Sequence, residues 1–351
     1  MSDEPGLSFT RARTPPRAIL FGCAGERLSA DERSLFAAAD PLGFVLFRRN
    51  CQSPGQVRAL VAALRDCVGR ADAPVLIDQE GGRVARLRPP HWRSYPAAAR
   101  LAALPDGEAD EAVRLGARLI ADDLASLGIS VDAAPVLDVP VAGADAVIGD
   151  RAYSGDPARV ARLGRAMCEG LLEGGVLPIV KHIPGHGRAR VDSHHDCPVV
   201  DAAIEELAIS DFEPFRRLAD MPWAMTAHVV YSAFDRKPAT LSRPVIEHVI
   251  RGQIGFDGVL VSDDIGMGAL SGRLGDRVGK ALHAGCDLAL HCSGAIGEMA
   301  DLAEIAPAIS AKTAARLERG EKMRLAAQRE FDRAEAETRF NSLIGVVAQR
   351  L

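Results

Sequence analysis

The chain has 351 residues, of which 48% are hydrophobic and 25% are charged, and its formal net charge is −5. This composition is that of a globular protein, and the length would fill either one large barrel or two average domains. The negative charge argues against a nucleic-acid-binding protein, because phosphate recognition needs a basic face.

The N-terminal residues and the cysteines predict the cellular compartment. Residues 1–16 lack the apolar core of a secretory signal, and no stretch approaches the roughly 18 apolar residues that a membrane span needs. The seven cysteines are odd in number, scattered and without a Cys-x-x-Cys pair, which is typical of reduced thiols. We therefore expect a cytoplasmic protein that binds no membrane.

Short apolar runs rich in β-forming residues alternate with longer helical patterns along the chain. The runs predict strands at residues 18–22, 43–47, 75–78, 131–139, 177–182, 224–230, 258–262 and 288–292. They are continuously apolar rather than alternating, as parallel strands covered on both faces are.

Between these runs, apolar residues recur at every third and fourth position, which predicts helices. The helical segments are residues 56–68, 108–127, 158–172 and 201–218. Ser242 is expected to cap a further helix with Pro244 just inside it. Beyond Ile305 an Ala/Glu/Arg-rich helical tail continues to about Val347.

Eight alternating units predict an α/β protein with a single (β/α)8 barrel. We expect one domain over residues 1–351, with the barrel core at about 17–310 and a helical tail, 311–351, that packs on it. The alternative is an open doubly wound sheet. Its usual Gly-x-Gly-x-x-Gly fingerprint is missing, because the first strand is followed by GCAGERL.

Polar residues stand at the ends of five predicted strands. In chain order these are Asp78-Gln79-Glu80, Asp138, Lys181-His182, His228 and Asp263-Asp264. Catalytic groups of a barrel gather at the C-terminal ends of its strands. Helix capping would explain any one of these groups, but five together favour a shared polar pocket.

The densest segment is KHIPGHGRARVDSHHDCP, residues 181–198, which holds four of the nine histidines. Its proline and glycines predict a loop. Zinc-dependent hydrolysis could use its histidines and aspartates, although the helical His-Glu-x-x-His spacing is absent. General acid/base catalysis is the other possibility, because Asp192 lies two residues before His194. In an extended loop both side chains would face the same side, and the carboxylate could orient the ring.

The segment GFDGVLVSDDIGMGAL, residues 255–270, places two adjacent carboxylates at the end of an apolar strand. Neighbours on a strand point to opposite faces, so we expect one of Asp263 and Asp264 to enter the pocket and the other to brace it. An inward aspartate that faces an acid/base group is the arrangement of a retaining glycosidase.

Two weaker signals are DQEGGRVARL, which contains Asp78 and Arg86, and VIGDRAY, which contains Arg151. Carboxylates accept hydrogen bonds from sugar hydroxyls, and guanidinium groups donate to sugar oxygens. Either segment alone could equally be an ordinary surface turn.

These four segments, together with MTAHVVY, resemble in the same order the motifs of the glycoside hydrolase family 3 β-N-acetylglucosaminidases. The resemblance covers about residues 19–292 and is greatest to the single-domain cytoplasmic type of peptidoglycan recycling. It implies a retaining exo-β-N-acetylglucosaminidase that removes terminal N-acetylglucosamine (GlcNAc) from GlcNAc-1,6-anhydroMurNAc muropeptides through a covalent glycosyl-enzyme. We expect this enzyme to be a monomer that needs no metal or other cofactor.

The same resemblance implies a role for individual residues. Asp263 matches the nucleophile, His194 the acid/base and Asp192 its dyad partner. The residues that match the sugar-binding set are Asp78, Arg86, Arg151, Lys181 and His182. The chain departs from the motifs at Ile183, Arg188-Ala189, Asp196-Cys197 and Ile265-Gly266. These departures leave the aglycone preference open. The alternatives are a β-glycosidase of another sugar specificity, a zinc-dependent hydrolase and a non-catalytic sugar-binding barrel.

Overall fold

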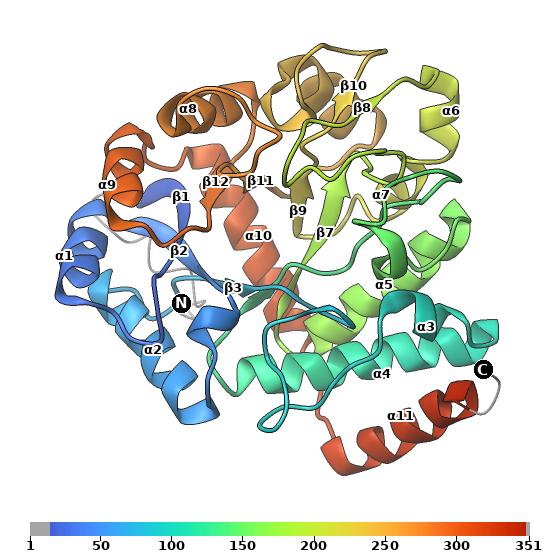
Figure 1. Ribbon diagram of the computed structural model, residues 1–351. Coiled ribbons are helices and arrows are strands. Elements are labelled where there is room, and N and C mark those ends of the chain that lie inside the picture. Colours follow the sequence, from blue (N-terminus) through green and yellow to red (C-terminus); the bar gives the residue numbers. More distant parts are fainter. Residues whose placement is uncertain (1–14, 349–351) are drawn as a thin grey trace, which may run out of the picture.

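A closed barrel of eight parallel strands forms the centre of the molecule in the computed structural model, which describes residues 15–348 (Figure 1). The strands are β1 (Arg17–Gly22), β2 (Pro41–Leu46), β3 (Val75–Ile77), β6 (Val131–Asp132), β7 (Leu177–Ile183), β9 (Trp223–Thr226), β11 (Val259–Asp264) and β12 (Leu288–His291). The first strand pairs in parallel with both β2 and β12, which closes the sheet. The predicted α/β barrel is therefore confirmed, and the open sheet is wrong.

Helices connect the strands and surround the barrel (Figure 1). They are α1 (Ala30–Ala39), α2 (Pro54–Cys67), α3 (Ala98–Ala102), α4 (Asp106–Ala125), α5 (Pro157–Glu173), α6 (Ile204–Ile209), α7 (Glu213–Arg217), α8 (Leu274–Ala284), α9 (Ile296–Ile305), α10 (Ala311–Ala327) and α11 (Arg333–Ala348). Shorter elements are the 3-10 turns η2 (Arg48–Asn50), η3 (Gly149–Arg151) and η4 (Ala239–Leu241) and the π-helix η5 (Val245–Gln253). Two small strand pairs complete the set, antiparallel β4 (Gln79–Gly81) with β5 (Val84–Ala85) and parallel β8 (Val199–Val200) with β10 (Val230–Tyr231).

Two apolar layers hold the barrel together. Side chains such as Leu20, Val45 and Val261 fill its interior. Others, such as Phe21 and Phe44, pack on the opposite faces of the same strands among the surrounding helices. Because both faces are covered, every residue of β2 and of β7 is buried. This burial explains why the strands read as continuous apolar runs.

The predicted strand at residues 131–139 is wrong in its length. Only Val131 and Asp132 form a continuous ladder, and one isolated bridge joins Val136 to Lys181 further on. Pro135 interrupts the segment, because a proline has no N–H to donate to a neighbouring strand.

The predicted helix at residues 201–218 is also wrong, because the chain forms α6 and α7 with a break between them. Pro214 lies in the first turn of α7, where its missing N–H costs nothing, so it starts a new helix.

Ser242 caps the next helix as expected, since its Oγ accepts the N–H of Val245 at 3.2 Å. Pro244 also lies just inside the helix as expected, because residues 243–244 form the helical turn that leads into η5.

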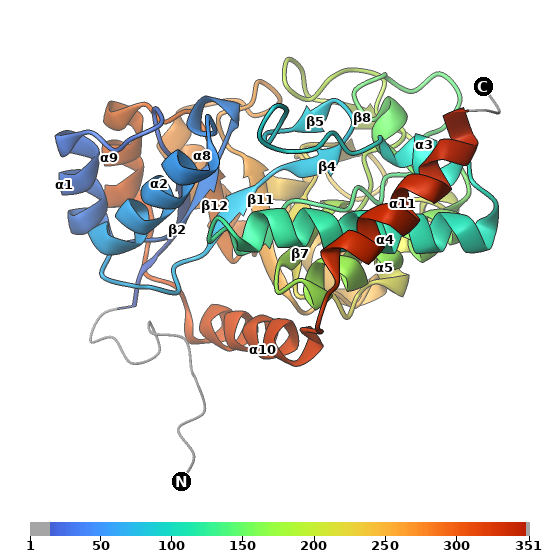
Figure 2. The same cartoon turned by 90° about the horizontal axis from the view of Figure 1, so that it is seen from below.

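The C-terminal helices pack on two different parts of the molecule (Figure 2). Helix α10 lies across the N-terminal end of the barrel, and α11 lies along α4. The ring of Phe340 on α11 is fully buried, and it lies so close to Gly116 of α4 that a Cβ there would be 3.0 Å from the ring. The end of the predicted tail, residues 349–351, lies outside the described residues, as do residues 1–14.

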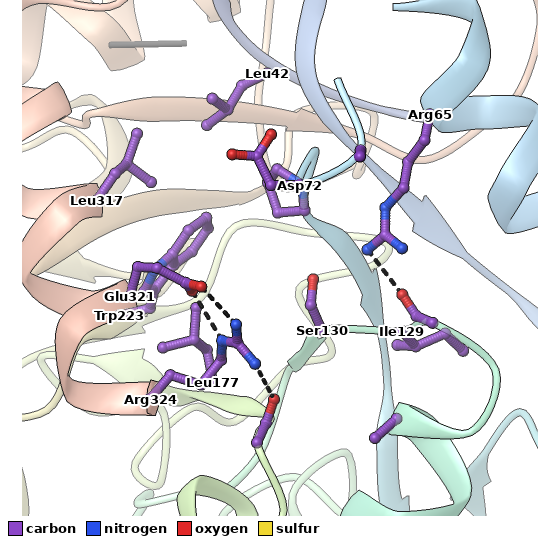
Figure 3. A pocket seen from close by; sticks show the side chains of 15 residues that line it. Leu42, Arg65, Asp72, Ile129, Ser130, Leu177, Trp223, Leu317, Glu321 and Arg324 are labelled. Atoms are coloured by element: carbon purple, nitrogen blue, oxygen red, sulfur yellow. Dashed lines mark hydrogen bonds and ion pairs between the residues drawn. The ribbon is translucent and has the colours of Figure 1, made fainter. Parts of the chain in front are cut away.

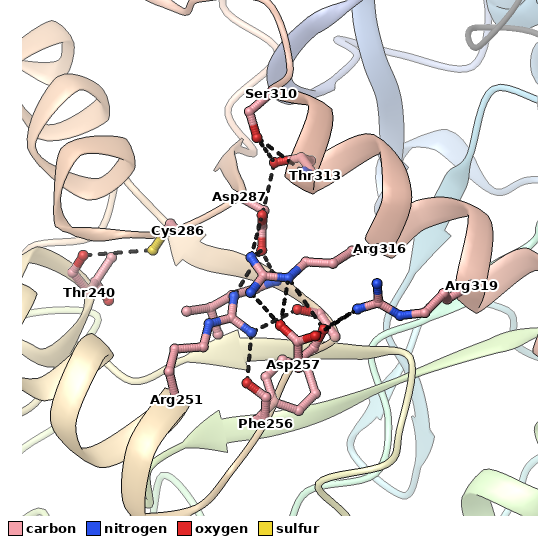
Figure 4. Close-up of polar contacts among 12 residues, drawn as sticks. Thr240, Arg251, Phe256, Asp257, Cys286, Asp287, Ser310, Thr313, Arg316 and Arg319 are labelled. Carbon is pink, nitrogen blue, oxygen red and sulfur yellow. Dashed lines mark hydrogen bonds and ion pairs between the residues drawn. The ribbon is translucent and has the colours of Figure 1, made fainter.

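A buried ionic cluster fixes α10 to the barrel (Figure 4). Arg316 of α10 donates to both oxygens of Asp287, at 2.9 and 3.1 Å. Asp287 directly precedes β12 and also accepts hydrogen bonds from Thr313 at 2.8 Å and Arg251 at 2.9 Å. Arg316 and Asp287 are both almost fully buried, and an unpaired charge in the protein interior is strongly destabilising. Each of the two charges is therefore stabilised by the other.

A cavity of about 310 Å³ remains between α10 and the N-terminal ends of the strands (Figure 3). Trp223 and Leu317 form part of its wall, and Arg324 pairs with Glu321 beside them. In a barrel this end contributes to stability, whereas the opposite end carries the chemistry.

None of the helices within residues 15–348 combines the length and the apolar character required to cross a membrane. All seven cysteines lie in the described part of the chain, and each is a free thiol.

Candidate active site

A cavity of about 630 Å³ opens at the C-terminal ends of the barrel strands. All the residues that the sequence analysis selected as site residues border it, namely Asp78, Arg86, Arg151, Lys181, His182, Asp192, His194 and Asp263. They come from β7, β11, the turn η3 and the segments that follow β3, β5 and β7, so the closed barrel brings together groups up to 185 positions apart in the sequence.

A network of five charged side chains lies at this cavity, and four of them line it. Lys181 on β7 is only 2% exposed, and its Nζ is 2.9 Å from Asp78 Oδ1 and 2.7 Å from Glu80 Oε1. Arg86 Nη2 donates to the other oxygen of Asp78 at 2.9 Å. Arg151 donates to both oxygens of Glu80, through Nη2 at 2.8 Å and Nε at 2.9 Å. Three cations therefore share two carboxylates.

The charges of this network are mutually stabilised. Burial alone would raise the pKa of Asp78, but Lys181 and Arg86 hold it far below its ordinary value. Burial also works against ionisation of Glu80, yet Lys181 and Arg151 lower the pKa of Glu80 to about 2. Both carboxylates are thus ionised at neutral pH. A network fixed in this way can receive sugar hydroxyls without rearranging, which is the condition for strong electrostatic recognition.

His182 is oriented from behind by a buried carboxylate. Its Nδ1 is 2.7 Å from Asp138 Oδ2, and Asp138 is fully buried. The other oxygen of Asp138 accepts the backbone N–H of His182 at 3.2 Å and of His186 at 2.6 Å. Burial opposes the charge on Asp138, but the His182 ring and these N–H groups keep its pKa below the ordinary value. With Nδ1 engaged, Nε2 is the His182 atom left for a ligand.

Asp263 and Asp264 at the end of β11 have different environments. Asp263 Oδ1 accepts the N–H of Asp264 at 2.8 Å. Burial alone would raise the pKa of Asp263, but the His228 and His182 rings lower it below its ordinary value. Burial raises the pKa of Asp264, and the neighbouring charge of Asp263 adds to this. Two adjacent carboxyls with oppositely shifted pKa values have different roles, and Asp263 is the one held as a carboxylate.

Asp264 also fits the expected bracing role. Its Oδ1 accepts the N–H of Gly266 at 3.0 Å and of Cys292 at 3.2 Å, so it ties the turn after β11 to the end of β12. Both aspartates border the cavity, however, so the prediction that only one enters it is wrong. The register between β11 and β12 shifts at this point, which turns the last residue of the strand.

Asp192 and His194 form a hydrogen-bonded pair at the cavity. His194 Nδ1 is 2.7 Å from Asp192 Oδ1, which also accepts the backbone N–H of His194 at 2.9 Å. Residues 192–196 form a turn, since the N–H groups of His195 and Asp196 both bond to the carbonyl of Asp192. The extended loop expected here is therefore wrong, and the aspartate reaches the ring by bending back over this turn. The His194 side chain is 60% exposed, so its Nε2 is accessible to a substrate.

The family of the chain follows from comparison with known proteins. Residues 19–321 match the family described as "Glycosyl hydrolase family 3 N terminal domain". The chain belongs to glycoside hydrolase family 3. Its match extends over most of the described barrel and includes every predicted site residue.

Curated relatives and solved structures agree with this assignment. The chain is 41% identical over 282 residues to a β-hexosaminidase of Alkalilimnicola ehrlichii, with 78% of this chain and 80% of that protein covered. It is 38% identical to a β-hexosaminidase of Pseudomonas aeruginosa, with 79% and 82% covered. Among solved structures, NagZ from Neisseria gonorrhoeae in complex with N-trifluoroacetyl-D-glucosamine has a TM-score of 0.82 at 31% identity, with 94% and 99% covered. This family 3 protein is therefore a glycoside hydrolase.

Three residues that contact the cavity lining were recognised in the sequence only as polar strand ends and were given no role. Glu80 holds Lys181 and Arg151, and Asp138 orients His182. His228 lies beside Asp263, with Nδ1 2.7 Å from Thr240 Oγ1 and Nε2 2.9 Å from the carbonyl of Asp264. Their position at the ends of strands was the available signal, but their partners are distant in sequence.

Within residues 15–348, no group of three or more His, Cys, Asp or Glu side chains is arranged to hold a metal ion.

Proposed function

We propose that this glycoside hydrolase is a retaining exo-β-N-acetylglucosaminidase. The observation that carries the proposal is the pairing of two functions in one cavity: Asp263 is held as a carboxylate, and His194 is oriented by Asp192. A retaining glycosidase needs a nucleophile and an acid/base group on the same sugar. Histidine takes the acid/base role that a second carboxylic acid has in most families.

In the first step, a carboxylate oxygen of Asp263 attacks the anomeric carbon of the terminal sugar. The bond from that carbon to the glycosidic oxygen breaks, and the protonated His194 gives its Nε2 proton to the departing oxygen. Asp192 engages Nδ1, so it fixes the ring with Nε2 toward the substrate. The products are a free alcohol and a glycosyl ester on Asp263.

In the second step, water replaces the leaving alcohol. His194 is now neutral and takes a proton from the water as its oxygen attacks the anomeric carbon, and the ester bond to Asp263 breaks. Two inversions give net retention, and the enzyme returns to its starting protonation state. The network of Asp78, Arg86 and Lys181 would hold the ring hydroxyls during both steps.

Relatives support the 2-acetamido sugar as substrate. Two curated relatives are named β-hexosaminidases, and one similar structure contains N-trifluoroacetyl-D-glucosamine. Another, from Paenibacillus sp., is a family 3 β-N-acetylglucosaminidase with 33% identity and a TM-score of 0.77, although this chain covers only 62% of it.

We further propose GlcNAc-1,6-anhydroMurNAc muropeptides as the natural substrate, in keeping with the motifs. The exposure of His194 supports a large aglycone, which can extend away from the cavity into solvent. Free thiols support a cytoplasmic location. The packing of α10 and α11 on the barrel supports a single domain, which we propose acts as a monomer.

Hydrolysis of aryl β-N-acetylglucosaminide and aryl β-glucoside by the purified protein tests the proposal. The N-acetylglucosaminide should have a kcat/KM larger by about four orders of magnitude, because a site built to bond a group strongly rejects analogues that lack it. Comparable kcat/KM values would favour a β-glycosidase of another sugar specificity. No turnover of either sugar would favour a non-catalytic barrel.

A further inference from the structure

Ser193, the residue between Asp192 and His194, is buried, although the two members of this acid/base dyad are much more exposed. Ser193 is 4% exposed, whereas the side chains of Asp192 and His194 are 33% and 60% exposed. The hydroxyl Oγ of Ser193 is 3.0 Å from Nε2 of His186. This contact joins the dyad turn to the start of the same loop, next to β7.

His186 is itself fixed in the barrel. It is 3% exposed, and its backbone N–H donates to Asp138 at 2.6 Å. Burial lowers the pKa of His186 to about 4, so the ring is neutral at working pH and can share one hydrogen bond with a hydroxyl. It has no part in the two chemical steps described above. Its bond to Ser193 is therefore unexplained by the proposed catalysis.

A second set of contacts holds the same turn from the side of the nucleophile. The carbonyl of Ser193 accepts the N–H of Ala269 at 3.2 Å, and the carbonyl of His194 accepts the N–H of Gly268 at 3.1 Å. Gly268 and Ala269 follow β11, the strand that carries Asp263. A Cβ on Gly268 would lie 2.6 Å from the His195 carbonyl oxygen and 2.8 Å from that of His194. The approach is so close that a side chain at this position would fit only if these carbonyls moved.

The start of the loop has an anchor of its own in Arg188. Its Nε donates to Asp211 at 2.6 Å and its Nη1 to Glu206 at 2.6 Å, so it ties the loop to α6 and to the segment before α7. This arginine is one of the departures from the family motif. Arg188 thus fixes the part of the loop next to His186. The turn with Asp192 and His194 lies beyond this anchor, and Ser193 connects that turn to His186.

We propose that Ser193 is a positioning residue, which with His186 and Gly268 forms a latch that holds His194 and Asp192 at the cavity for proton transfer. The inference rests on the proposed function, since it assigns the latch to the acid/base step. Opening the latch removes the proton donor and base from the substrate while the sugar-binding network and Asp263 stay in place.

Replacement of Ser193 by alanine tests the latch. Ser193→Ala should lower kcat/KM for a GlcNAc disaccharide by about tenfold or more, because a buried hydrogen bond is lost and His186 is left unpaired. The first step on an aryl glycoside with a good leaving group should change by less than about twofold, since that oxygen needs no proton. Its second step should slow, and azide should restore turnover with formation of the β-glycosyl azide. Azide attacks the anomeric carbon and displaces Asp263 without any proton transfer.

Gly268→Ala is an independent variant that removes no functional group. Its methyl group must push the carbonyls of His194 and His195 away, so the same selective loss and the same azide response are expected. Ser130→Ala and Gly279→Ala are the matched controls. Ser130 bonds Val75 at the opposite end of the barrel, and Gly279 has open space around its Cβ position. Both controls should keep the wild-type ratio of disaccharide to aryl-glycoside kcat/KM.

The outcomes separate the latch from the proposed function. If the wild type is active and His194→Ala responds to azide, but Ser193→Ala and Gly268→Ala lower both substrates equally without an azide response, the latch is wrong and the function stands. If the wild type hydrolyses no N-acetylglucosaminide, the proposed function fails and the latch with it. Melting temperatures identify a variant that is merely unfolded, and the other variant then decides.

Discussion

Replacement of Glu80 by glutamine is the most informative change in the charged network of the cavity. Glu80 holds Lys181 and Arg151 in place, and its side chain is only 8% exposed. Wild type balances three cations with two carboxylates. In Glu80→Gln the three cations share Asp78 alone, and two of them lose their nearest anion.

The expected loss of stability follows from the pKa of Glu80. Burial opposes its charge, but Lys181 and Arg151 bring the pKa from the ordinary 4.5 to about 2. That pKa difference corresponds to a contribution of about 3 kcal/mol to the free energy of unfolding when Glu80 is ionised. Removal of one partner of a buried ion pair lowers the free energy of unfolding by about 3–5 kcal/mol, in agreement with this value. The displaced cations should also lower kcat/KM by about a hundredfold.

The sign of the pH dependence distinguishes this explanation from a simple packing defect. A lowered carboxyl pKa stabilises the fold above pH 4.5, and this contribution disappears as the pH falls through 2. The stability difference between wild type and Glu80→Gln should therefore shrink by about 2 kcal/mol between pH 7 and pH 3.

Urea denaturation at both pH values, followed by circular dichroism, measures this difference. Glu111→Gln is the control, because Glu111 pairs with Arg339 on the surface and should contribute less than about 1 kcal/mol. A Glu80→Gln protein as stable and as active as this control would show that Glu80 does not stabilise the charged network.

Three further predictions concern the acid/base group, metal dependence and a buried carboxyl. His194→Ala should slow GlcNAc disaccharides most and regain turnover of aryl glycosides with azide; an equal loss on both substrates without an azide response would place the acid/base elsewhere. Hydrolysis should survive prolonged treatment with a chelator, and a loss that zinc reverses would instead favour the zinc-dependent hydrolase. Asp132→Asn should stabilise the protein at pH 8 by up to about 4 kcal/mol and have no effect near pH 4. Burial raises the pKa of Asp132 to about 7, so the folded wild type loses stability as the pH rises from about 4 to 7. Denaturation curves at the two pH values that coincide for wild type and variant would contradict this.

The fold was predictable as far as the pattern of apolar residues determines it. All eight barrel strands were found, because each is a buried run between helical patterns. The errors lie where one residue overrides a pattern. Pro135 ends the ladder of β6, and Pro214 restarts a helix that the periodicity had made continuous. The position of α10 across the barrel was not predictable, since its contact through Arg316 and Asp287 joins two residues 29 positions apart.

The members of the site were more predictable than their connections. Strand ends and motifs selected the residues around the cavity, because chemistry gathers there in a barrel. The pairing of Glu80 with Arg151, 71 positions further along, depends on how the barrel closes. The bond between Ser193 and His186 was missed for another reason. Serine and histidine in a loop carry no pattern that distinguishes a buried contact from a solvated one.

Trapping of the covalent intermediate is the most direct test of Asp263 as the nucleophile of a retaining glycosidase. The protein is mixed with a fluorinated N-acetylglucosamine analogue that slows the second step, and its intact mass is measured. We expect a mass increase of one sugar, which fragmentation of the peptide assigns to Asp263 and which Asp263→Ala abolishes. A sugar attached to Asp264, or turnover with no adduct and with inversion at the anomeric carbon, would contradict it.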